Sequence, residues 1–142
     1  MASRFDQLVI YTDGSITPVG AGAGVVIQTG SGELVHVENQ ILAPMTNNEA
    51  EYAALALGLE IAAQLNAAIV EIRADSEVMI CQMRGEFAVK SQLLKQKHWL
   101  ACKLARSFLR VRYIHIPREE NALADTLAAE ASAGRRWTLG VR

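Results

Sequence analysis

Four acidic residues stand at positions where an acid is locally unfavourable. Asp13 and Asp75 each follow a short β-rich run, Glu51 lies in the first turns of a long apolar helix pattern, and Asp125 lies among apolar residues of an Ala-rich segment. If the two β-rich runs are neighbouring strands, Asp13 and Asp75 converge at one edge of a sheet. A helix packed over that edge can add Glu51. The spacing therefore predicts a cluster of carboxylates.

Such a cluster has a specific chemistry. Crowded carboxylates repel one another and need a cation if all are to stay ionised. A set of oxygen ligands with little His or Cys favours Mg²⁺ or Mn²⁺ over Zn²⁺. This arrangement suits phosphoryl transfer, in which two metal ions about 4 Å apart activate a water molecule and stabilise the leaving oxygen.

Three of the acids have structural alternatives that stay open at this point. Asp13 and Gly14 could form an ordinary turn, and Asp75 could cap the helix that follows it. Asp125 could face solvent or pair with Arg118, although Asp is a poor residue for the interior of a helix.

Glu51 has an alternative that the sequence weakens. It could be the partner of a helix cap at Asn48. However, Thr46 and Glu49 already have the spacing of a capping box, in which each side chain bonds the other residue's backbone N–H. Glu51 is surplus to that role, which favours a function for its carboxylate.

The elements that must position these acids follow from hydrophobic patterning and turn residues. Strands are expected over 8–12, 21–29, 33–42, 68–74 and 110–116, and helices over 48–65, 76–83, 91–108 and 119–133. The second and third strands form a hairpin. The order βββαβααβα predicts an α/β fold with a five-stranded mixed sheet, an antiparallel hairpin plus parallel strands, flanked by helices.

Composition sets further limits. The 142 residues fit one domain, with a core over about 7–133 and a tail at 134–142, and 51% hydrophobic residues can fill that core. No stretch approaches the roughly 18 apolar residues of a membrane span. Cys81 and Cys102 have no metal-ligand spacing and are expected to be reduced thiols. We expect a soluble, cytoplasmic monomer. With a net charge of −1, any grip on nucleic acid must come from a local patch.

Four motifs in order resemble the type 1 ribonuclease H family. They are Tyr11-Thr12-Asp13-Gly14-Ser15, Thr46-Asn47-Asn48-Glu49-Ala50-Glu51-Tyr52, Ala74-Asp75-Ser76-Glu77 and His115-Ile116-Pro117-Arg118-Glu119-Glu120-Asn121-Ala122-Leu123-Ala124-Asp125. The resemblance covers about residues 8–133. It implies endonucleolytic hydrolysis of the RNA strand of RNA–DNA hybrids, leaving 5′-phosphate and 3′-hydroxyl ends.

The resemblance also implies the catalytic set. Asp13, Glu51, Asp75 and Asp125 would bind two Mg²⁺ ions, with Mn²⁺ as a possible substitute. Asp13 would bridge both ions, Glu51 and Asp75 would hold one, and Asp125 the other. His115 has the spacing of the family's catalytic histidine, ten residues before the last Asp, but its surroundings are typical of a strand. A proton shuttle needs mobility and access, so a structural role stays equally open.

Substrate contacts are implied at two places. Gly14 and Ser15 open the loop after the first acid, which is shorter here than in many members and lacks their Asn-Pro. Thr46, Asn47 and Asn48 begin a helix, where free N–H groups and side-chain amides can meet phosphate, 2′-hydroxyl or minor-groove edges. Asn47 or Asn48 could instead be only a cap.

The sequence also departs from the family. The basic, Trp-rich handle of some bacterial members is absent, and the region 85–108 resembles the handle-free bacterial and archaeal branch. Lys95, Lys103 and Arg106 lie near one helix face, which could track a phosphate backbone but is more often only solvated, and Trp99 is expected in the core. We expect modest hybrid affinity that falls as salt rises. A non-catalytic hybrid- or RNA-binding module is the competing hypothesis, though it gives no reason to keep four repelling acids.

Overall fold

A computed structural model describes residues 5–140. Its centre is a six-stranded mixed sheet with the strand order β5-β4-β1-β2-β3-β6. The strands are β1 (Phe5–Thr17), β2 (Gly20–Thr29), β3 (Leu34–Leu42), β4 (Ala67–Ala74), β5 (Arg110–His115) and β6 (Thr138–Gly140). β1, β2 and β3 pair antiparallel, whereas β4 pairs parallel with β1 and with β5. The predicted mixed sheet is thus confirmed.

Two strands differ from the expectation. β1 does not end at Asp13 but continues to Thr17, because residues 14–17 keep pairing with the Gly- and Ala-rich start of β2, and the expected loop shrinks to a turn at Pro18 and Val19. The expected tail supplies the sixth strand. β6 pairs with β3, where the side chain of Asn39 accepts a hydrogen bond from the Trp137 N–H at 2.7 Å and donates one to the carbonyl of Arg135 at 3.0 Å.

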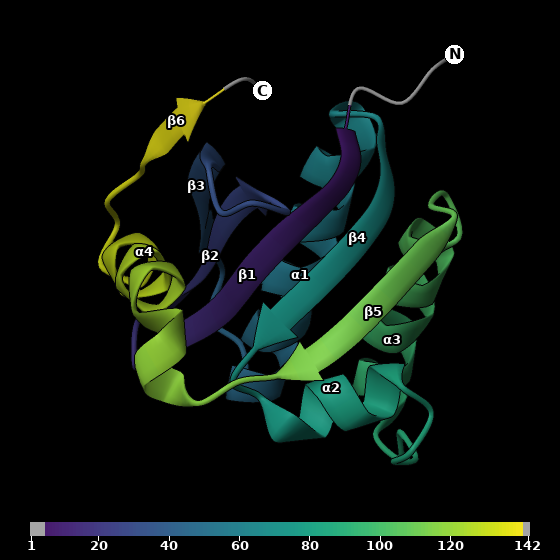
Figure 1. Ribbon diagram of the computed structural model, residues 1–142. Coiled ribbons are helices and arrows are strands. Elements are labelled where there is room, and N and C mark those ends of the chain that lie inside the picture. Colours follow the sequence, from purple (N-terminus) through teal and green to yellow (C-terminus); the bar gives the residue numbers. More distant parts are fainter. Residues whose placement is uncertain (1–4, 141–142) are drawn as a thin grey trace.

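Helices cover both faces of the sheet (Figure 1). They are α1 (Asn47–Gln64), α2 (Glu77–Met83), α3 (Gln92–Ala105) and α4 (Ala122–Ser132), the last preceded by the 3₁₀ turn η1 (Arg118–Asn121). α1 and α3 lie behind the sheet and α4 lies in front of it. The main core fills the space between α1 and the sheet, with Leu8, Ile10 and Ile72 fully buried. Burial of this apolar surface is what fixes α1 against β1.

One core assignment from the sequence was wrong. Trp99 lies on α3 with 58% of its surface exposed, and the Lys103 ammonium sits 5.2 Å from the centre of its ring. Ala101 is the residue of α3 that is buried. The helical pattern of α3 is ambiguous because Leu93, Trp99 and Leu100 all lie on its exposed side.

Among the described residues, no helix has the length and apolar character to cross a membrane. Cys81 and Cys102 are free thiols.

Candidate active site

A cleft of about 580 Å³ opens at the edge where β4 and β5 end. Its lining residues come from β1, α1, the segments after β4 and β5, and α4; they are Asp13, Gly14, Asn47, Glu51, Asp75, Ser76, His115, Ile116, Pro117, Arg118, Glu119 and Asp125. All four predicted acids therefore face one cleft, although they are spread over most of the chain. Open α/β sheets usually bind their ligands at the carboxyl ends of the parallel strands, which is where these acids lie.

Asp13 lies within β1 and is only 6% exposed. The parallel pairing of β1 with β4 stops two residues earlier, at Tyr11 and Arg73. Asp13 consequently stands beside the end of β4 while still paired to Gly24 of β2. The alternative that Asp13 and Gly14 form a turn is wrong, because both belong to the strand.

Glu51 reaches the cleft from α1, and Gly14 makes its position possible. A Cβ atom on Gly14 would lie 2.5 Å from the carbonyl carbon of Ala50 and 2.6 Å from the nitrogen of Glu51, so only glycine lets α1 approach β1 this closely. The Gly14 N–H donates a hydrogen bond to the Glu51 carboxylate. The predicted capping box is present as well: Glu49 N–H donates to Thr46 Oγ1 at 3.2 Å, and Thr46 N–H to Glu49 Oε1 at 3.0 Å. Glu51 takes no part in it.

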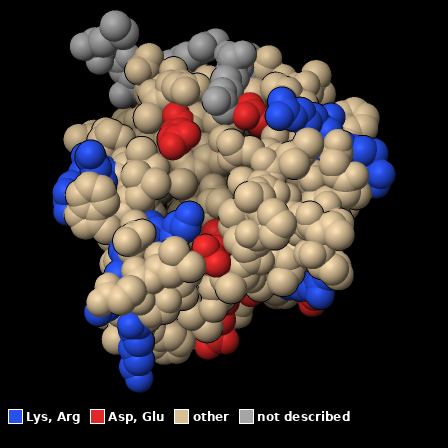
Figure 2. Space-filling model, turned by 180° about the vertical axis from the view of Figure 1, so that it is seen from behind, with Lys and Arg blue, Asp and Glu red and all other residues tan. Residues whose placement is uncertain are grey.

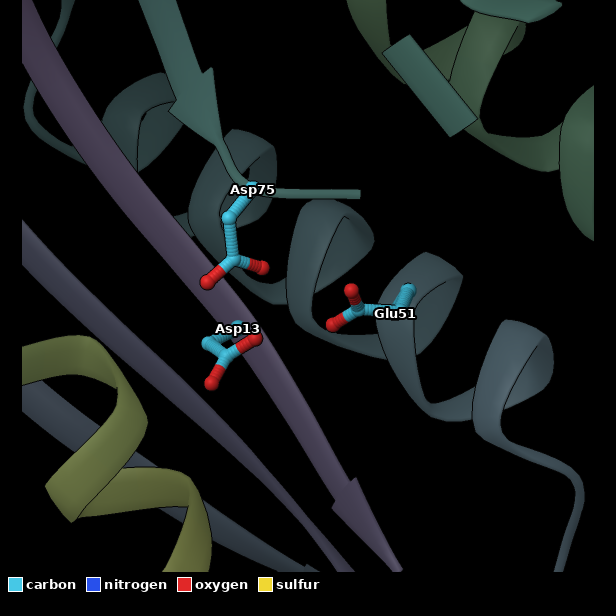
Figure 3. A group of neighbouring side chains, drawn as sticks. All are labelled: Asp13, Glu51 and Asp75. Atoms are coloured by element: carbon cyan, nitrogen blue, oxygen red, sulfur yellow. The ribbon is translucent and has the colours of Figure 1, made fainter. Parts of the chain in front are cut away.

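Asp75 follows the last residue of β4. It is not the cap of the next helix, since Ser76 is the N-cap of α2 and its hydroxyl accepts a hydrogen bond from the Met79 N–H at 3.3 Å. Figure 3 shows the side chains of Asp13 on β1, Glu51 on α1 and Asp75 just after β4 pointing toward one another. One carboxylate oxygen from each lies within 4.8 Å of the others.

Burial and mutual repulsion change the acidity of this group. Burial, followed by the nearby Glu51 charge, raises the pKa of Asp13 from 3.8 to about 10. Burial is also the largest effect on Glu51 and raises its pKa from 4.5 to about 7, although the hydrogen bond from Gly14 acts in the opposite direction. Without a cation, the buried pair therefore holds protons that isolated carboxyl groups would release at neutral pH.

The donor set fits a divalent cation. Three carboxylates within reach of one point are hard oxygen ligands, and a bound cation would replace the protons that the raised pKa values keep on the metal-free group. The geometric cluster is limited to Asp13, Glu51 and Asp75 among the described residues.

Asp125 joins the cleft from α4 but in a different environment. Its side chain is 38% exposed, and a carboxylate oxygen lies 3.9 Å from Nη2 of Arg118. Asp125 thus lines the cleft, but it is also partly exposed to solvent and close to Arg118, as the two structural alternatives expected. Asp125 lies in the first turn of α4, where a negative charge is favourable.

The position of Asp125 depends on glycines of β2. A Cβ atom on Gly24 would lie 2.3 Å from the Ala124 carbonyl oxygen, and one on Gly22 would lie 2.3 Å from that of Ala128. α4 therefore packs with its backbone directly on β2. The glycine-rich sequence 20–24, which has no phosphate-loop role, is a platform for the helix that carries Asp125.

Asn121 is a positioning residue that sequence reasoning did not identify. Its side chain is 1% exposed, and its Nδ2 donates a hydrogen bond to the carbonyl of Thr12 at 2.9 Å. This bond ties the start of α4 to β1 at the residue before Asp13. The family motif contained Asn121, but no periodicity or spacing distinguishes a buried anchor from an ordinary cap.

The other predicted site residues divide into two groups. Gly14, Asn47 and His115 line the cleft, and His115 is the exposed last residue of β5, so its strand character and its access coexist. Ser15, Thr46 and Asn48 do not line it. Ser15 has its hydroxyl 3.4 Å from that of Ser132, Thr46 is occupied as the cap of α1, and Asn48 is an exposed residue in the first turn of α1.

Comparison with known proteins agrees with this architecture. Residues 11–131 match the family model described as reverse transcriptase-like. The bifunctional protein Rv2228c of Mycobacterium tuberculosis is 37% identical over 128 residues, which are 88% of this chain and 35% of that protein. The chain thus spans about a third of the length of that curated relative.

Two solved structures are similar over nearly their whole length. The ribonuclease H1 of the halophilic archaeon Halobacterium salinarum is 32% identical, with a TM-score of 0.87 over 90% of this chain and 98% of that one. LC11-RNase H1, solved in complex with an RNA/DNA hybrid, is 36% identical, with a TM-score of 0.84 over 89% and 97%. With the sheet order, the helices on both faces and the acidic cleft, these matches establish that the chain belongs to the ribonuclease H family, among its type 1 members.

Proposed function

We propose that this protein hydrolyses the RNA strand of RNA–DNA hybrids as a metal-dependent endoribonuclease. The observation that carries the proposal is the convergence of Asp13, Glu51 and Asp75 in one cleft, with ligand oxygens within 4.8 Å of one another. Similarity to LC11-RNase H1, a protein solved with an RNA/DNA hybrid, supports the substrate class.

All four acids would act as metal ligands in this proposal. Asp13, Glu51 and Asp75 would hold divalent cations, with Asp125 adding a ligand from α4. When bound, two Mg²⁺ ions, or Mn²⁺ in their place, supply the positive charge that a phosphodiester needs during displacement. Water would lose a proton to solvent and add to phosphorus, and the bond to the 3′ oxygen would break as that oxygen takes up a proton. The products carry a 5′-phosphate and a 3′-hydroxyl.

Residues around the acids would hold the substrate and move protons. His115 is exposed at the mouth of the cleft, where its imidazole can give a proton to the departing 3′ oxygen. Gly14, which donates to Glu51, would act mainly by positioning that acid. Asn47, which begins α1 and lines the cleft, would donate from its side-chain amide to a phosphate or a 2′-hydroxyl. We further propose that the protein is a single-domain monomer of the cytoplasm.

The test is cleavage of a labelled RNA–DNA hybrid in Mg²⁺, with Mn²⁺, EDTA, duplex RNA and duplex DNA as parallel reactions. We expect cutting of the RNA strand of the hybrid alone, and none in EDTA. Asp75→Asn should abolish cutting while the chain stays folded by circular dichroism. Glu51→Gln should do the same, whereas its matched control Glu60→Gln, an exposed residue of the same helix, should retain full activity.

The outcome also separates the competing hypothesis. A pure protein that binds hybrid but cuts nothing with either metal would be a hybrid-binding module, and the roles proposed for the acids would be wrong. Cutting that survives EDTA would contradict the metal-dependent mechanism.

A further inference from the structure

Within residues 5–140, one region of the sheet has no helix over it. In front of the sheet, α4 packs against β1, β2 and β3, and Figure 1 shows β4 and β5 lying beside it without a helix before them. Val70, Ile72 and Ala74 of β4 point into the core behind the sheet. Because side chains alternate along a strand, Glu71 and Arg73 point to the uncovered front.

Three arginines gather on this uncovered face. Arg112 of β5 lies opposite Glu71 in the register, and its Nη1 is 3.6 Å from the Glu71 carboxylate. Arg73 binds the same carboxylate at 2.6 Å. Arg110, two residues before Arg112, shares its face by strand alternation and is exposed. Glu71 is the acid between them, and it is 5% exposed. The face therefore presents a net positive charge.

Among the described residues behind the sheet, the exposed basic side chains include Lys95 and Lys103 of the helix α3. Seen from behind, Lys and Arg lie in several places, one of them near the middle of the view beside an acidic residue (Figure 2). The arginines of the uncovered face are instead held in rows by the strand register. Arg73 is further fixed by donating a hydrogen bond from Nη1 to the Tyr11 hydroxyl at 2.7 Å, and its guanidinium lies 5.5 Å from the centre of the Tyr11 ring.

This arginine face is continuous with the cleft. Arg73, near the end of β4, precedes Asp75 by two residues, a separation of about 6.6 Å along an extended chain. Arg112 and then Arg110 lie progressively farther from the cleft along β5. An anionic chain leaving the acids across the front of the sheet would meet these guanidinium groups in succession.

We propose that Arg73, Arg110 and Arg112 form a second nucleic-acid contact surface, which binds the single-stranded continuation of the RNA strand beyond the hybrid held at the acids. The inference rests on the proposed function for the identity of that strand. Guanidinium groups bind phosphates in a planar, bidentate manner. An open sheet face with an aromatic ring and arginine planes suits unpaired, splayed RNA rather than a duplex. The strand at the acids is the one that is cut, which in the proposed function is the RNA. The strand that continues from the acids onto the arginine face is therefore also the RNA.

The test compares affinities of two hybrids for the chain in an Asp75→Asn background, by fluorescence anisotropy in Mg²⁺. One hybrid is blunt, and the other carries a single-stranded RNA extension at its 5′ or its 3′ end. We expect one of the extensions to tighten binding by roughly tenfold at low salt. The double variant Arg110→Gln/Arg112→Gln should lose most of that gain, and its slope of log affinity against log salt should fall by about 1.4, as for two single-strand phosphate contacts.

The matched control is Lys95→Gln/Lys103→Gln, which removes the same charge from exposed positions of α3, behind the sheet. It should keep the gain from the extension. Arg110→Gln alone leaves both arginines beside Glu71 in place, and it should lose part of the gain even if the double variant unfolds. An extension that adds no affinity, or an equal loss in the lysine control, would overturn the proposal. Failure of the proposed function would appear separately, as absence of cutting of the blunt hybrid by the chain with Asp75 intact.

Discussion

The two sides of the cleft are built differently. On one side, Asp13 and Glu51 are almost fully buried, and α1 is held against β1 by the close approach at Gly14. On the other, Asp125 is 38% exposed, pairs at long range with Arg118, and is carried by a helix resting on the glycines of β2. Burial raises the pKa of Asp13 and of Glu51. Binding a cation would therefore relieve repulsion between the buried acids, whereas Asp125 on the exposed side is already in contact with water and with Arg118.

The largest effect expected from this difference is on catalysis. Asp13→Asn should lower the cleavage rate by at least about a thousandfold, because it removes the acid central to the buried cluster. Asp125→Asn should lower it less, by roughly ten- to a hundredfold, since water can reach that position and replace an oxygen ligand. Single-turnover cleavage of a labelled hybrid measures both, and Asp6→Asn, an exposed position on the same strand as Asp13, is the matched control. Equal losses for the two acids would remove the proposed asymmetry.

The second effect concerns the platform under α4. Gly24→Ala should destabilise the fold by about 1–3 kcal/mol, because the added methyl group must displace the α4 backbone. It should also lower activity more than the stability loss explains, since Asp125 moves with the helix. Chemical denaturation gives the free energy of unfolding. Gly30→Ala is the control, because its new atom would meet only the Gln7 side chain, at 3.6 Å or farther. A fully active Gly24→Ala protein of native stability would contradict this account of α4.

The third effect is a pH dependence confined to the buried side. In EDTA, Asp13 and Glu51 bind protons more strongly in the folded chain than in the unfolded one, where their pKa values lie near 3.8 and 4.5. Their contribution to stability is therefore fully present below about pH 4 and is lost as pH rises through about 7 for Glu51 and toward about 10 for Asp13. Between pH 5 and pH 9 the metal-free chain should therefore lose stability as these two groups ionise.

Asp13→Asn provides the comparison that isolates this contribution. The amide cannot ionise, so in EDTA the variant should be more stable than the parent chain at pH 8, and its melting temperature should depend less on pH. Saturating Mg²⁺ should restore the stability of the parent chain at pH 8. It should change the stability of the variant little, because metal binding requires the ionised carboxylates. Parallel pH profiles for the two proteins in EDTA would rule out the coupled buried pair.

Sequence reasoning succeeded for features with local signals and failed where packing between distant segments decided the outcome. The capping box of α1 and the strand–helix order have short-range patterns, and the structure has both. The extension of β1 to Thr17 depends on its partner β2, and the burial of α3 depends on which face meets α1, so Trp99 was misplaced. β6 depends on a contact with β3: Asn39, almost a hundred residues earlier in the chain, accepts a hydrogen bond from the Trp137 N–H just before β6. No periodicity near residue 138 indicates that strand.

The same limit applied to the cleft. The four acids could be selected because each is locally awkward, and the family motifs then ordered them. The residues that hold these acids in position could not be identified from the sequence. Gly14, Gly22 and Gly24 are explained only by the backbone atoms that approach them from α1 and α4. Asn121 is recognisable only once its bond to the Thr12 carbonyl is seen.

The smallest effect sharpens the role of that last residue. Asn121→Ala removes a buried hydrogen bond and should cost about 1–2 kcal/mol of stability. If Asn121 acts by positioning α4, its loss should also reduce cleavage several-fold in the chain with Asp125, and by much less in an Asp125→Asn background. A double-mutant cycle on the cleavage rate measures this coupling. Additive losses would mean that Asn121 only stabilises the fold, and the exposed side of the cleft would then owe its geometry to the glycine platform alone.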